Sequence, residues 1–409
     1  MGFHQRLAIL TRLEAMSFAE HAIIWQVYPL GAVAAPIRPT EAEELVHRLP
    51  TLETWLDYVL ELGCNAILLG PVFASETHGY DTLDFFRVDP RLGDEADLEA
   101  LISGARERGI GVLFDGVFNH VSRNSPYASL TTGESFEGHG ALAELDHSRD
   151  EVVDLVVEVM NHWLDRGIAG WRLDAVYAVD AAFWQQVLPR VREYHPDAWI
   201  LGEMIHGDYA HYVEESGIDS VTQYELWKAT WSSLKEENFF ELEWNLGRHN
   251  NFLEHFVPQT FVGNHDVTRI ATQVGQEKAA LAAAVLFTVG GTPSIYYGDE
   301  QGVMGVKEER IGGDDEIRPP LPEQYSPLGE WMHQIYHDLV ALRRTHPWLH
   351  TARTEVEDIE NTRITYRSFE VDAGGVDTGK WVRVKLNSEN PAFEITDHAG
   401  GEFSWVAAG

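Results

Sequence analysis

Residues 168–175 read IAGWRLDA, a short apolar run with Arg172 and Asp174 two positions apart near its end. Successive side chains of a β-strand point to opposite faces, so on a strand these two charged groups lie side by side on one face. In most proteins such a pair is a structural ion pair. Whether this pair is structural or functional therefore depends on the residues that the rest of the chain places around it.

Seven further runs resemble this one, and each is followed by a segment with helical periodicity, such as LETWLDYVLELG (52–63) or EADLEALISGARERG (95–109). This alternation is typical of parallel βα units, and the glycine that closes the second segment is typical of a helix end. Eight units predict an α/β fold, a closed (β/α)8 barrel. The runs are IIWQVYP (23–29), NAILLGPV (65–72), GVLFDGVFN (111–119), IAGWRLDA (168–175), AWILGEM (198–204), DSVTQYEL (219–226), QTFVGNHD (259–266) and PSIYYGDE (293–300).

Two irregular segments interrupt the alternation. The stretch between His120 and about Ser148 is too long for an ordinary loop after a strand, and residues 301–322 are similarly irregular. From about Trp348 the chain changes to short alternating segments at 362–371, 380–387 and 402–407, which predict a small antiparallel β domain. We therefore expect a catalytic barrel over 1–347 with a short inserted subdomain at about 121–148, followed by a C-terminal β domain over 348–409.

Charge and composition narrow the class of partner. The 409 residues carry 30 Lys and Arg against 65 Asp and Glu, a formal charge of −35 that disfavours nucleic acid and anionic membranes. Cys64 is the one cysteine, which excludes an intramolecular disulfide, and its apolar surroundings predict a core position. The start MGFHQRLAIL lacks a leader pattern, and no run approaches the roughly 20 apolar residues of a membrane span. We expect a cytoplasmic protein whose oligomeric state stays open.

The active site of such a barrel lies at the C-terminal ends of its strands. Polar groups gather at the right-hand ends of the runs, although each alone has an ordinary structural explanation. All of them would lie together at the C-terminal rim of the predicted barrel, and this grouping favours a functional site there. These residues are Asp115, Asn119, His120, Arg172, Asp174, Glu203, His265 and Asp266.

Three carboxylates, Asp174, Glu203 and Asp266, converge without a serine nucleophile motif or an HExxH helix, which favours glycoside cleavage over peptide or ester hydrolysis. One carboxylate can act as nucleophile and another as acid and then base. A guanidinium beside Asp174 would lower the pKa of this carboxyl and orient it, as a nucleophile requires. A metal site built on His120 and His265 is an alternative, but no pair of histidines four residues apart supports it.

Five segments, HGYDTLDFFRVDPRLG (78–93), DGVFNH (115–120), GWRLDA (170–175), LGEM (201–204) and FVGNHD (261–266), resemble the conserved segments of the α-amylase family, glycoside hydrolase family 13, in their usual order. The resemblance implies that Asp174 is the nucleophile, Glu203 the general acid/base and Asp266 the transition-state stabiliser. It further implies that the sugar is held by Arg172, His120 and His265 and stacks on Tyr80. Members of the family cleave α-glucosidic bonds with retention of configuration.

Within the family, GEMIHGDY (202–209) resembles the acid/base segment of cyclomaltodextrinases and neopullulanases, and DDEIR (314–318) resembles a substrate-contacting Asp and Arg, here Asp314 and Arg318. This implies short or cyclic maltooligosaccharide substrates with α-1,4 bonds, and α-1,6 bonds as an open alternative. Two alternative hypotheses remain, a transglycosylase of the same family and a sugar-binding relative without catalytic activity.

The chain also departs from the family. Residues 175–179 read AVYAV, where typical α-amylases carry a Lys–His pair on the leaving-group side. The segment after the third strand is shorter than the family's usual second domain, so we expect neither bound calcium nor any other cofactor, although Asn119 is present.

Overall fold

The computed structural model describes residues 18–39, 44–322 and 329–407. The start of the chain, in which the sequence shows no leader pattern, lies outside these ranges. Eight parallel strands form one sheet, and each coincides with a predicted run. In spatial order they are β11 (Ser220–Val221), β10 (Trp199–Gly202), β9 (Gly170–Leu173), β5 (Gly111–Gly116), β2 (Ala66–Leu69), β1 (Ile24–Val27), β13 (Thr292–Tyr296) and β12 (Gln259–Phe261).

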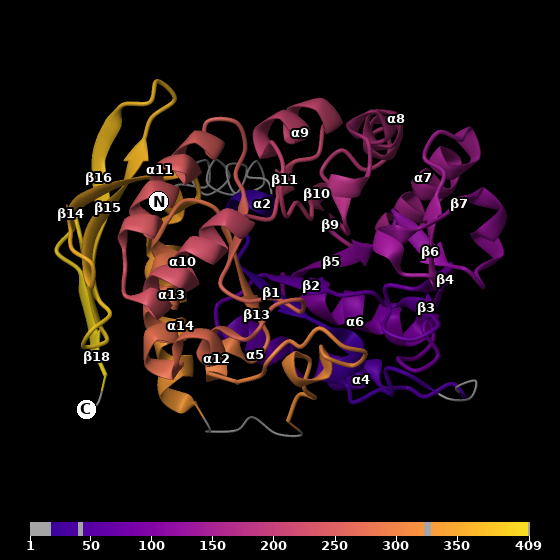
Figure 1. Cartoon of the computed structure of the whole chain (residues 1–409), viewed down its shortest axis with the longest axis horizontal. Coiled ribbons are helices and arrows are strands. Elements are labelled where there is room, and N and C mark those ends of the chain that lie inside the picture. Colours follow the sequence, from indigo (N-terminus) through magenta and orange to yellow (C-terminus); the bar gives the residue numbers. More distant parts are fainter. Residues whose placement is uncertain (1–17, 40–43, 323–328, 408–409) are drawn as a thin grey trace, which may run out of the picture.

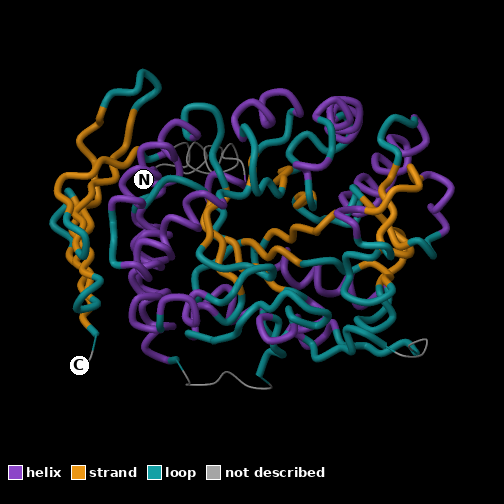
Figure 2. Tube along the Cα trace, in the orientation of Figure 1, coloured by secondary structure: helices purple, strands orange, loops and turns teal. Residues whose placement is uncertain are grey.

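The sheet closes through one bridge. The strands β11 and β12 stand at the two ends of the spatial order, and a parallel bridge joins Thr222 to Gln259 just beyond β11. The backbone N–H of Gln223 also donates to the carbonyl of Gln259 at 2.9 Å. The predicted (β/α)8 barrel is therefore confirmed, and Figures 1 and 2 show its strands surrounded by helices.

Helices cover the outside of the barrel. The predicted helix at 95–109 is α6, which begins with a capping box between Asp94 and Asp97 and is followed by Gly109 at φ +72°. The predicted helix at 52–63 is instead divided into α4 and α5. The helices are α2 (Phe18–His21), α3 (Pro29–Ala32), α4 (Leu49–Glu53), α5 (Leu56–Glu61), α6 (Glu95–Glu107), α7 (Asp150–Leu164), α8 (Ala181–Arg192), α9 (Tyr209–Ser216), α10 (Tyr224–Glu236), α11 (Phe240–Phe252), α12 (Ile270–Val274), α13 (Gln276–Thr288) and α14 (Glu330–Thr345).

Three antiparallel sheets are added to the barrel. A hairpin of β3 (Phe73–Ser75) and β4 (Thr82–Val88) follows β2, and the sequence analysis did not predict it. The segment after His120 folds into β6 (His120–Ser122), β7 (Thr131–Ser135) and β8 (Leu142–Leu145), which we call the excursion sheet. The C-terminal sheet contains β14 (Arg353–Ile359), β15 (Arg363–Val371), β16 (Asp377–Asn387), β17 (Ala392–Asp397) and β18 (Glu402–Val406).

Figure 1 shows the excursion strands and the C-terminal sheet at opposite ends of the molecule. The alanine-rich helix α13 is buried over Ala279–Thr288 and contacts both β16 and β17, so it links the barrel to the C-terminal sheet. Cys64 is buried as a free thiol, as predicted. Across the described ranges, none of the helices has the length and apolar character that a bilayer crossing requires.

The two-residue period of the strands creates the site. An apolar cluster fills part of the barrel and includes Leu113 and Leu201. Two positions further along the chain come Asp115, still within β5, and Glu203, which directly follows the end of β10. Gly170 precedes Arg172 by the same spacing, and a Cβ atom at Gly170 would lie 2.0 Å from the carbonyl oxygen of Trp199. The strand β9 can therefore approach β10 closely only with glycine at this position.

Candidate active site

A cavity of about 420 Å³ opens at the C-terminal ends of the strands. It brings together seven of the nine predicted site residues, Tyr80, His120, Asp174, Glu203, Asp266, Asp314 and Arg318. The other two, Arg172 and His265, are buried and contact these lining residues from behind. The cavity is also lined by His78, Phe136, Glu137, His139, Leu142, Ala175, Tyr177, Ile205, Tyr224, Val267 and Lys307.

Arg172 contacts three carboxylates. Its Nη1 lies 2.7 and 2.8 Å from the two oxygens of Asp115 and 3.2 Å from Oδ1 of Asp174. Its Nη2 lies 2.8 Å from Oε1 of Glu203. The guanidinium is therefore a structural partner of Asp115 and at the same time holds both predicted catalytic carboxylates.

The environment of Asp174 differs from the sequence-based expectation. Burial and the nearby Glu203 carboxylate raise the pKa of Asp174 well above its usual value, although Arg172 opposes this shift. We expected Arg172 to determine the direction, but a single guanidinium shared among three carboxylates cannot offset the desolvation of Asp174. The position of Arg172 is as predicted, and its expected net effect on the pKa is wrong.

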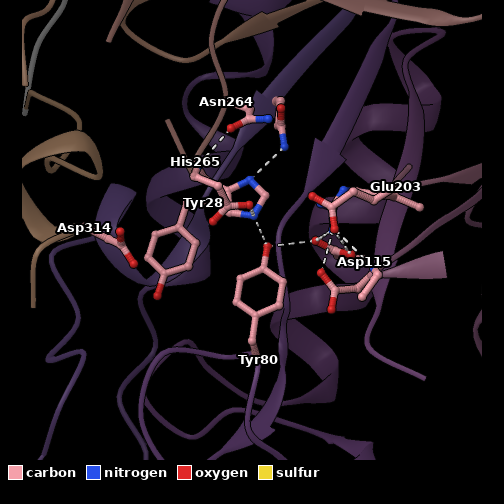
Figure 3. A network of polar contacts seen from close by, with 12 residues as sticks. Tyr28, Tyr80, Asp115, Glu203, Asn264, His265 and Asp314 are labelled. Carbon is pink, nitrogen blue, oxygen red and sulfur yellow. Dashed lines mark hydrogen bonds and ion pairs between the residues drawn. The ribbon is translucent and has the colours of Figure 1, made fainter. Parts of the chain in front are cut away.

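Glu203 is oriented by two further donors. Its Oε2 accepts the backbone N–H of Ala175 at 3.1 Å, and its Oε1 accepts the hydroxyl of Tyr224 at 3.2 Å. The side-chain amide of Asn264 donates in turn to the Tyr224 hydroxyl at 2.8 Å. Tyr224 and Asn264 both lie within predicted strand runs, but only the fold shows that they meet Glu203. Figure 3 shows Asn264 and Glu203 on the two sides of the network.

The pKa of Asp266 is shifted in the opposite direction from that of Asp174. Its Oδ2 lies 2.9 Å from Nε2 of His265, its Oδ1 lies 3.1 Å from Nη2 of Arg318, and its side chain is 34% exposed. Burial raises the pKa of Asp266, but His265, Arg318 and Arg172 together bring it well below its usual value. Two aspartates of one pocket thus have opposite pKa shifts, which is how one site gives two carboxylates different chemical roles.

Tyr80 connects these groups. Its hydroxyl donates to Oδ2 of Asp115 at 2.9 Å and contacts Nε2 of His265, as Figure 3 shows. The rings of Tyr80 and His265 are parallel with centroids 5.3 Å apart, and Gln26 contacts Nδ1 of His265 at 3.1 Å. Tyr80 lines the cavity, and stacking of a sugar on its ring stays a prediction. Its hydroxyl belongs to the polar network behind the predicted catalytic carboxylates.

His120 occupies the base of the excursion sheet. Its Nε2 donates to the carbonyl of Tyr80 at 2.9 Å, and its Nδ1 accepts the amide of Asn119 at 3.2 Å. Burial lowers the pKa of His120 to about 4, so the ring is neutral near pH 7. Both ring nitrogens are therefore engaged with protein groups. Within the described ranges, the one group of three potential metal ligands is formed by His47 and by Asp94 and Asp97 at the start of α6, and none of the three lines the cavity.

Asp314 and Arg318 meet on the loop that follows β13. Nη2 of Arg318 lies 3.3 Å from Oδ2 of Asp314, and its guanidinium lies 4.5 Å from the ring centroid of Tyr28. The pair is thus an ion pair that also forms one wall of the cavity, beside Asp266. Sequence reasoning missed three further lining residues, Glu137, Ile205 and Lys307. Glu137 and Lys307 lie in irregular segments without a motif, and Ile205 is an apolar residue within the motif GEMIHGDY that gave no chemical signal of its own.

Comparisons with known proteins agree with this geometry. The sequence profile described as "Alpha amylase, catalytic domain" matches residues 49–134 and 136–326. A cyclomaltodextrinase from Bacillus sp. is 30% identical over 72% of this chain and 58% of its own length, and neopullulanase 2 from Thermoactinomyces vulgaris is 30% identical over 73% and 55%. The chain therefore spans little more than half the length of these two relatives.

Solved structures show the same architecture. A structure named cyclomaltodextrinase superposes with a TM-score of 0.78 and 26% identity over 90% of this chain and 70% of that one. The cyclic α-maltosyl-(1→6)-maltose hydrolase of Arthrobacter globiformis, in complex with that sugar, has a TM-score of 0.80 at 20% identity over 95% of this chain and 99% of that one, which shows the fold alone. On the profile match and the two relatives at 30% identity, the chain belongs to the α-amylase family.

Proposed function

We propose that this protein is a retaining glycoside hydrolase that cleaves α-glucosidic bonds by double displacement. The observation that carries the proposal is the single guanidinium of Arg172, which contacts Asp174 at 3.2 Å and Glu203 at 2.8 Å on the floor of the cavity. A retaining mechanism requires two carboxyl groups beside the sugar, one as nucleophile and one as acid/base, and Arg172 holds two such groups at the cavity. A site with a single catalytic acid, or a site that only binds sugar, would not need both carboxylates.

In the first step, Asp174 attacks the anomeric carbon while Glu203 gives its proton to the departing oxygen. The burial that raises the pKa of Asp174 also favours its neutral form, which the covalent glycosyl ester resembles. In the second step, Glu203 takes a proton from water, and the water attacks the same carbon from the face that the leaving group has vacated. The bond between this carbon and Asp174 breaks, which releases the Asp174 carboxylate. Retention of configuration follows from the two displacements.

Asp266 stabilises the transition state of each of the two steps. Its contacts with His265 and Arg318 keep it ionised, so it offers a negative charge to the positive charge that develops on the sugar ring. His120, neutral and donating to the carbonyl of Tyr80, forms part of the wall against which the ring packs. No step requires a metal or an organic cofactor.

The substrate class follows from the relatives and the cavity together. Relatives at 30% identity are named as a cyclomaltodextrinase and a neopullulanase, and the cavity has a wall formed by Asp314 and Arg318. We infer short or cyclic maltooligosaccharides with α-1,4 bonds as substrates, and α-1,6 bonds as the second linkage to test. A cytoplasmic location is part of the same proposal, supported by a relative from Bacillus subtilis named intracellular maltogenic amylase, at 28% identity.

The test is incubation with linear, branched and cyclic maltooligosaccharides, with chromatography of the products and NMR of the first anomer released. The expected result is hydrolysis of the linear and cyclic sugars with an α-anomer as first product. Products longer than the substrate at high substrate concentration would identify a transglycosylase instead. A β-anomer as first product, or no turnover of any of these sugars, would contradict the proposal.

A further inference from the structure

The excursion sheet reaches over the cavity through the short turn Phe136–Gly138. Phe136, Leu142 and Ala175 form a small apolar cluster separate from the barrel core, and Tyr177 packs against it. Phe136 also stacks on His120, with ring centroids 4.5 Å apart. The turn is therefore anchored next to Asp174, because Ala175 is the following residue in the chain.

A direct hydrogen bond joins the turn to the barrel. The hydroxyl of Tyr177 donates to Oε1 of Glu137 at 3.0 Å, and both residues line the cavity. Glu137 is exposed, and its backbone has φ 47° and ψ 28°, a left-handed conformation that residues other than glycine rarely adopt. The turn thus presents an acidic side chain to the cavity in a conformation that costs free energy, which is common where function fixes the backbone.

The Glu137–Tyr177 contact lies on the Glu203 side of the cavity. The backbone N–H of Val176, the residue before Tyr177, donates to the backbone carbonyl of Glu203 at 3.2 Å. In agreement with this placement, burial and then the Glu203 carboxylate raise the pKa of Tyr177. Ile205, two residues after Glu203, lines the cavity, and the ring of His206 lies 5.0 Å from that of Tyr177. Asp266, Asp314 and Arg318 form a different wall, joined to one another by ion pairs.

In the proposed reaction the leaving group departs beside Glu203, since this residue protonates the departing oxygen. We propose that Glu137 and Tyr177 bind the sugar on this leaving-group side and so determine which leaving groups the enzyme accepts. A carboxylate accepts several hydrogen bonds, so Glu137 can bind sugar hydroxyls while it still accepts that of Tyr177. The phenol ring offers an apolar face to the sugar. The inference rests on the proposed function and adds two residues that determine specificity.

The experiment compares two substrates with the same maltosyl group and different leaving groups, maltotriose and p-nitrophenyl α-maltoside. Glucose as a leaving group has hydroxyls for Glu137, and nitrophenol has none. We expect Glu137→Ala to lower kcat/KM for maltotriose about tenfold and to leave that for the aryl maltoside within about twofold. Tyr177→Phe should act in the same direction, and the double variant should lose less than the sum of the two, because the residues act as a pair.

Tyr127→Phe is the matched control. Tyr127 lies in the same excursion, and its hydroxyl donates to Asp84 at 3.4 Å, but it does not line the cavity. Glu137→Gln, which keeps an acceptor, should restore part of the maltotriose activity. Equal losses on the two substrates, or an effect of Glu137→Ala no larger than that of Tyr127→Phe, would overturn the inference and leave the proposed function intact. A wild-type enzyme inactive on both substrates would instead overturn the proposed function, and this inference with it.

Discussion

Arg172 is bound more closely by Asp115 than by Asp174. Its Nη1 lies 2.7 and 2.8 Å from the oxygens of Asp115 and 3.2 Å from that of Asp174. Asp115 and Arg172 are register partners on the adjacent strands β5 and β9, and both are buried. The guanidinium is therefore fixed by the barrel itself. The Arg172 guanidinium stays in place without Asp174 and Glu203, and it can therefore orient both of these carboxylates.

The first prediction concerns this anchor. Asp115→Asn should lower the free energy of unfolding by about 3 kcal/mol or more, since it leaves a buried guanidinium without its closest counter-charge. Urea denaturation measures the change. Asp57→Asn is the matched control, because Asp57 pairs with Arg108 at 2.6 Å on the exposed surface and its loss should leave the midpoint unchanged. Equal midpoints for Asp115→Asn and the control would contradict the anchoring role.

The second prediction concerns the proposed nucleophile. Asp174→Asn should reduce kcat by about a thousandfold or more, because an amide cannot form the covalent intermediate. The fold should persist, since Arg172 retains Asp115 and Glu203. Turnover of p-nitrophenyl α-maltoside measures the loss, and circular dichroism checks the fold. A folded Asp174→Asn protein with near-normal activity would remove Asp174 from the mechanism.

The third prediction follows from the raised pKa of Asp174. Between its unfolded pKa of about 3.9 and its higher folded pKa, the native state binds more protons than the unfolded state, so this residue makes stability fall as pH rises. Asparagine cannot ionise. Asp174→Asn should therefore melt above the wild type near pH 7, and the two melting temperatures should converge toward about pH 4. Scanning calorimetry over this range gives the difference.

Asp266→Asn provides the opposite case in the same pocket. Because the folded pKa of Asp266 is lowered, its charge stabilises the native state above the unfolded pKa, and this contribution is lost as pH falls below about 3.9 toward the folded pKa. Asp266→Asn should melt below the wild type near pH 7. Both aspartate variants shifting in the same direction would show that their melting temperatures report packing changes and not charge.

The sequence predicted the barrel well because each strand has a local signal, a short apolar run. Only two residues of DSVTQYEL became strand β11, yet its place in the order was still correct. Strand β14, RTEVEDI, was missed because its side chains are largely exposed and charged, so it lacks an apolar pattern. The hairpin β3–β4 was missed because β3 has only three residues and β4 does not alternate regularly between buried and exposed side chains.

Site residues could be predicted where they follow a strand. Those that meet through the fold could not. Tyr224 is the first residue of α10 and Asn264 lies after β12, 40 positions away, yet Tyr224 bonds to Glu203 and Asn264 bonds to Tyr224. Glu137 and Tyr177 are likewise 40 positions apart and have no shared motif. The direction of the Asp174 shift was mispredicted because burial, the dominant cause, depends on all surrounding segments.

The fourth prediction concerns calcium. Calcium takes about six to eight oxygen ligands, and the acidic residues of the excursion are few. Glu137 is engaged with Tyr177, and Asp146 accepts the hydroxyl and backbone N–H of Ser148 at 2.5 and 3.2 Å. The excursion is instead joined to the β3–β4 hairpin by direct bonds, such as that from Ser122 to Glu76 at 2.6 Å.

We therefore expect the melting temperature and kcat/KM to be the same in a chelator and in millimolar calcium. A ligand that binds the native state raises its stability in proportion to the logarithm of ligand concentration over Kd, so a bound ion would be detected. Magnesium at the same concentration is the control for ionic strength. A melting temperature that rises with calcium but not with magnesium would contradict this expectation.

The last prediction concerns substrate size and the wall formed by Asp314 and Arg318. This pair contacts Asp266 through Arg318 and limits the cavity there, so long glucans should fit poorly. We expect a higher kcat/KM for maltotriose or a cyclomaltodextrin than for soluble starch. Asp314→Ala should open this wall and so reduce the difference in kcat/KM between the small sugars and starch. Asp315→Ala is the matched control, because Asp315 pairs with Arg38 outside this cavity. If starch is the better substrate of the wild type, or if both variants behave alike, the wall does not select for size.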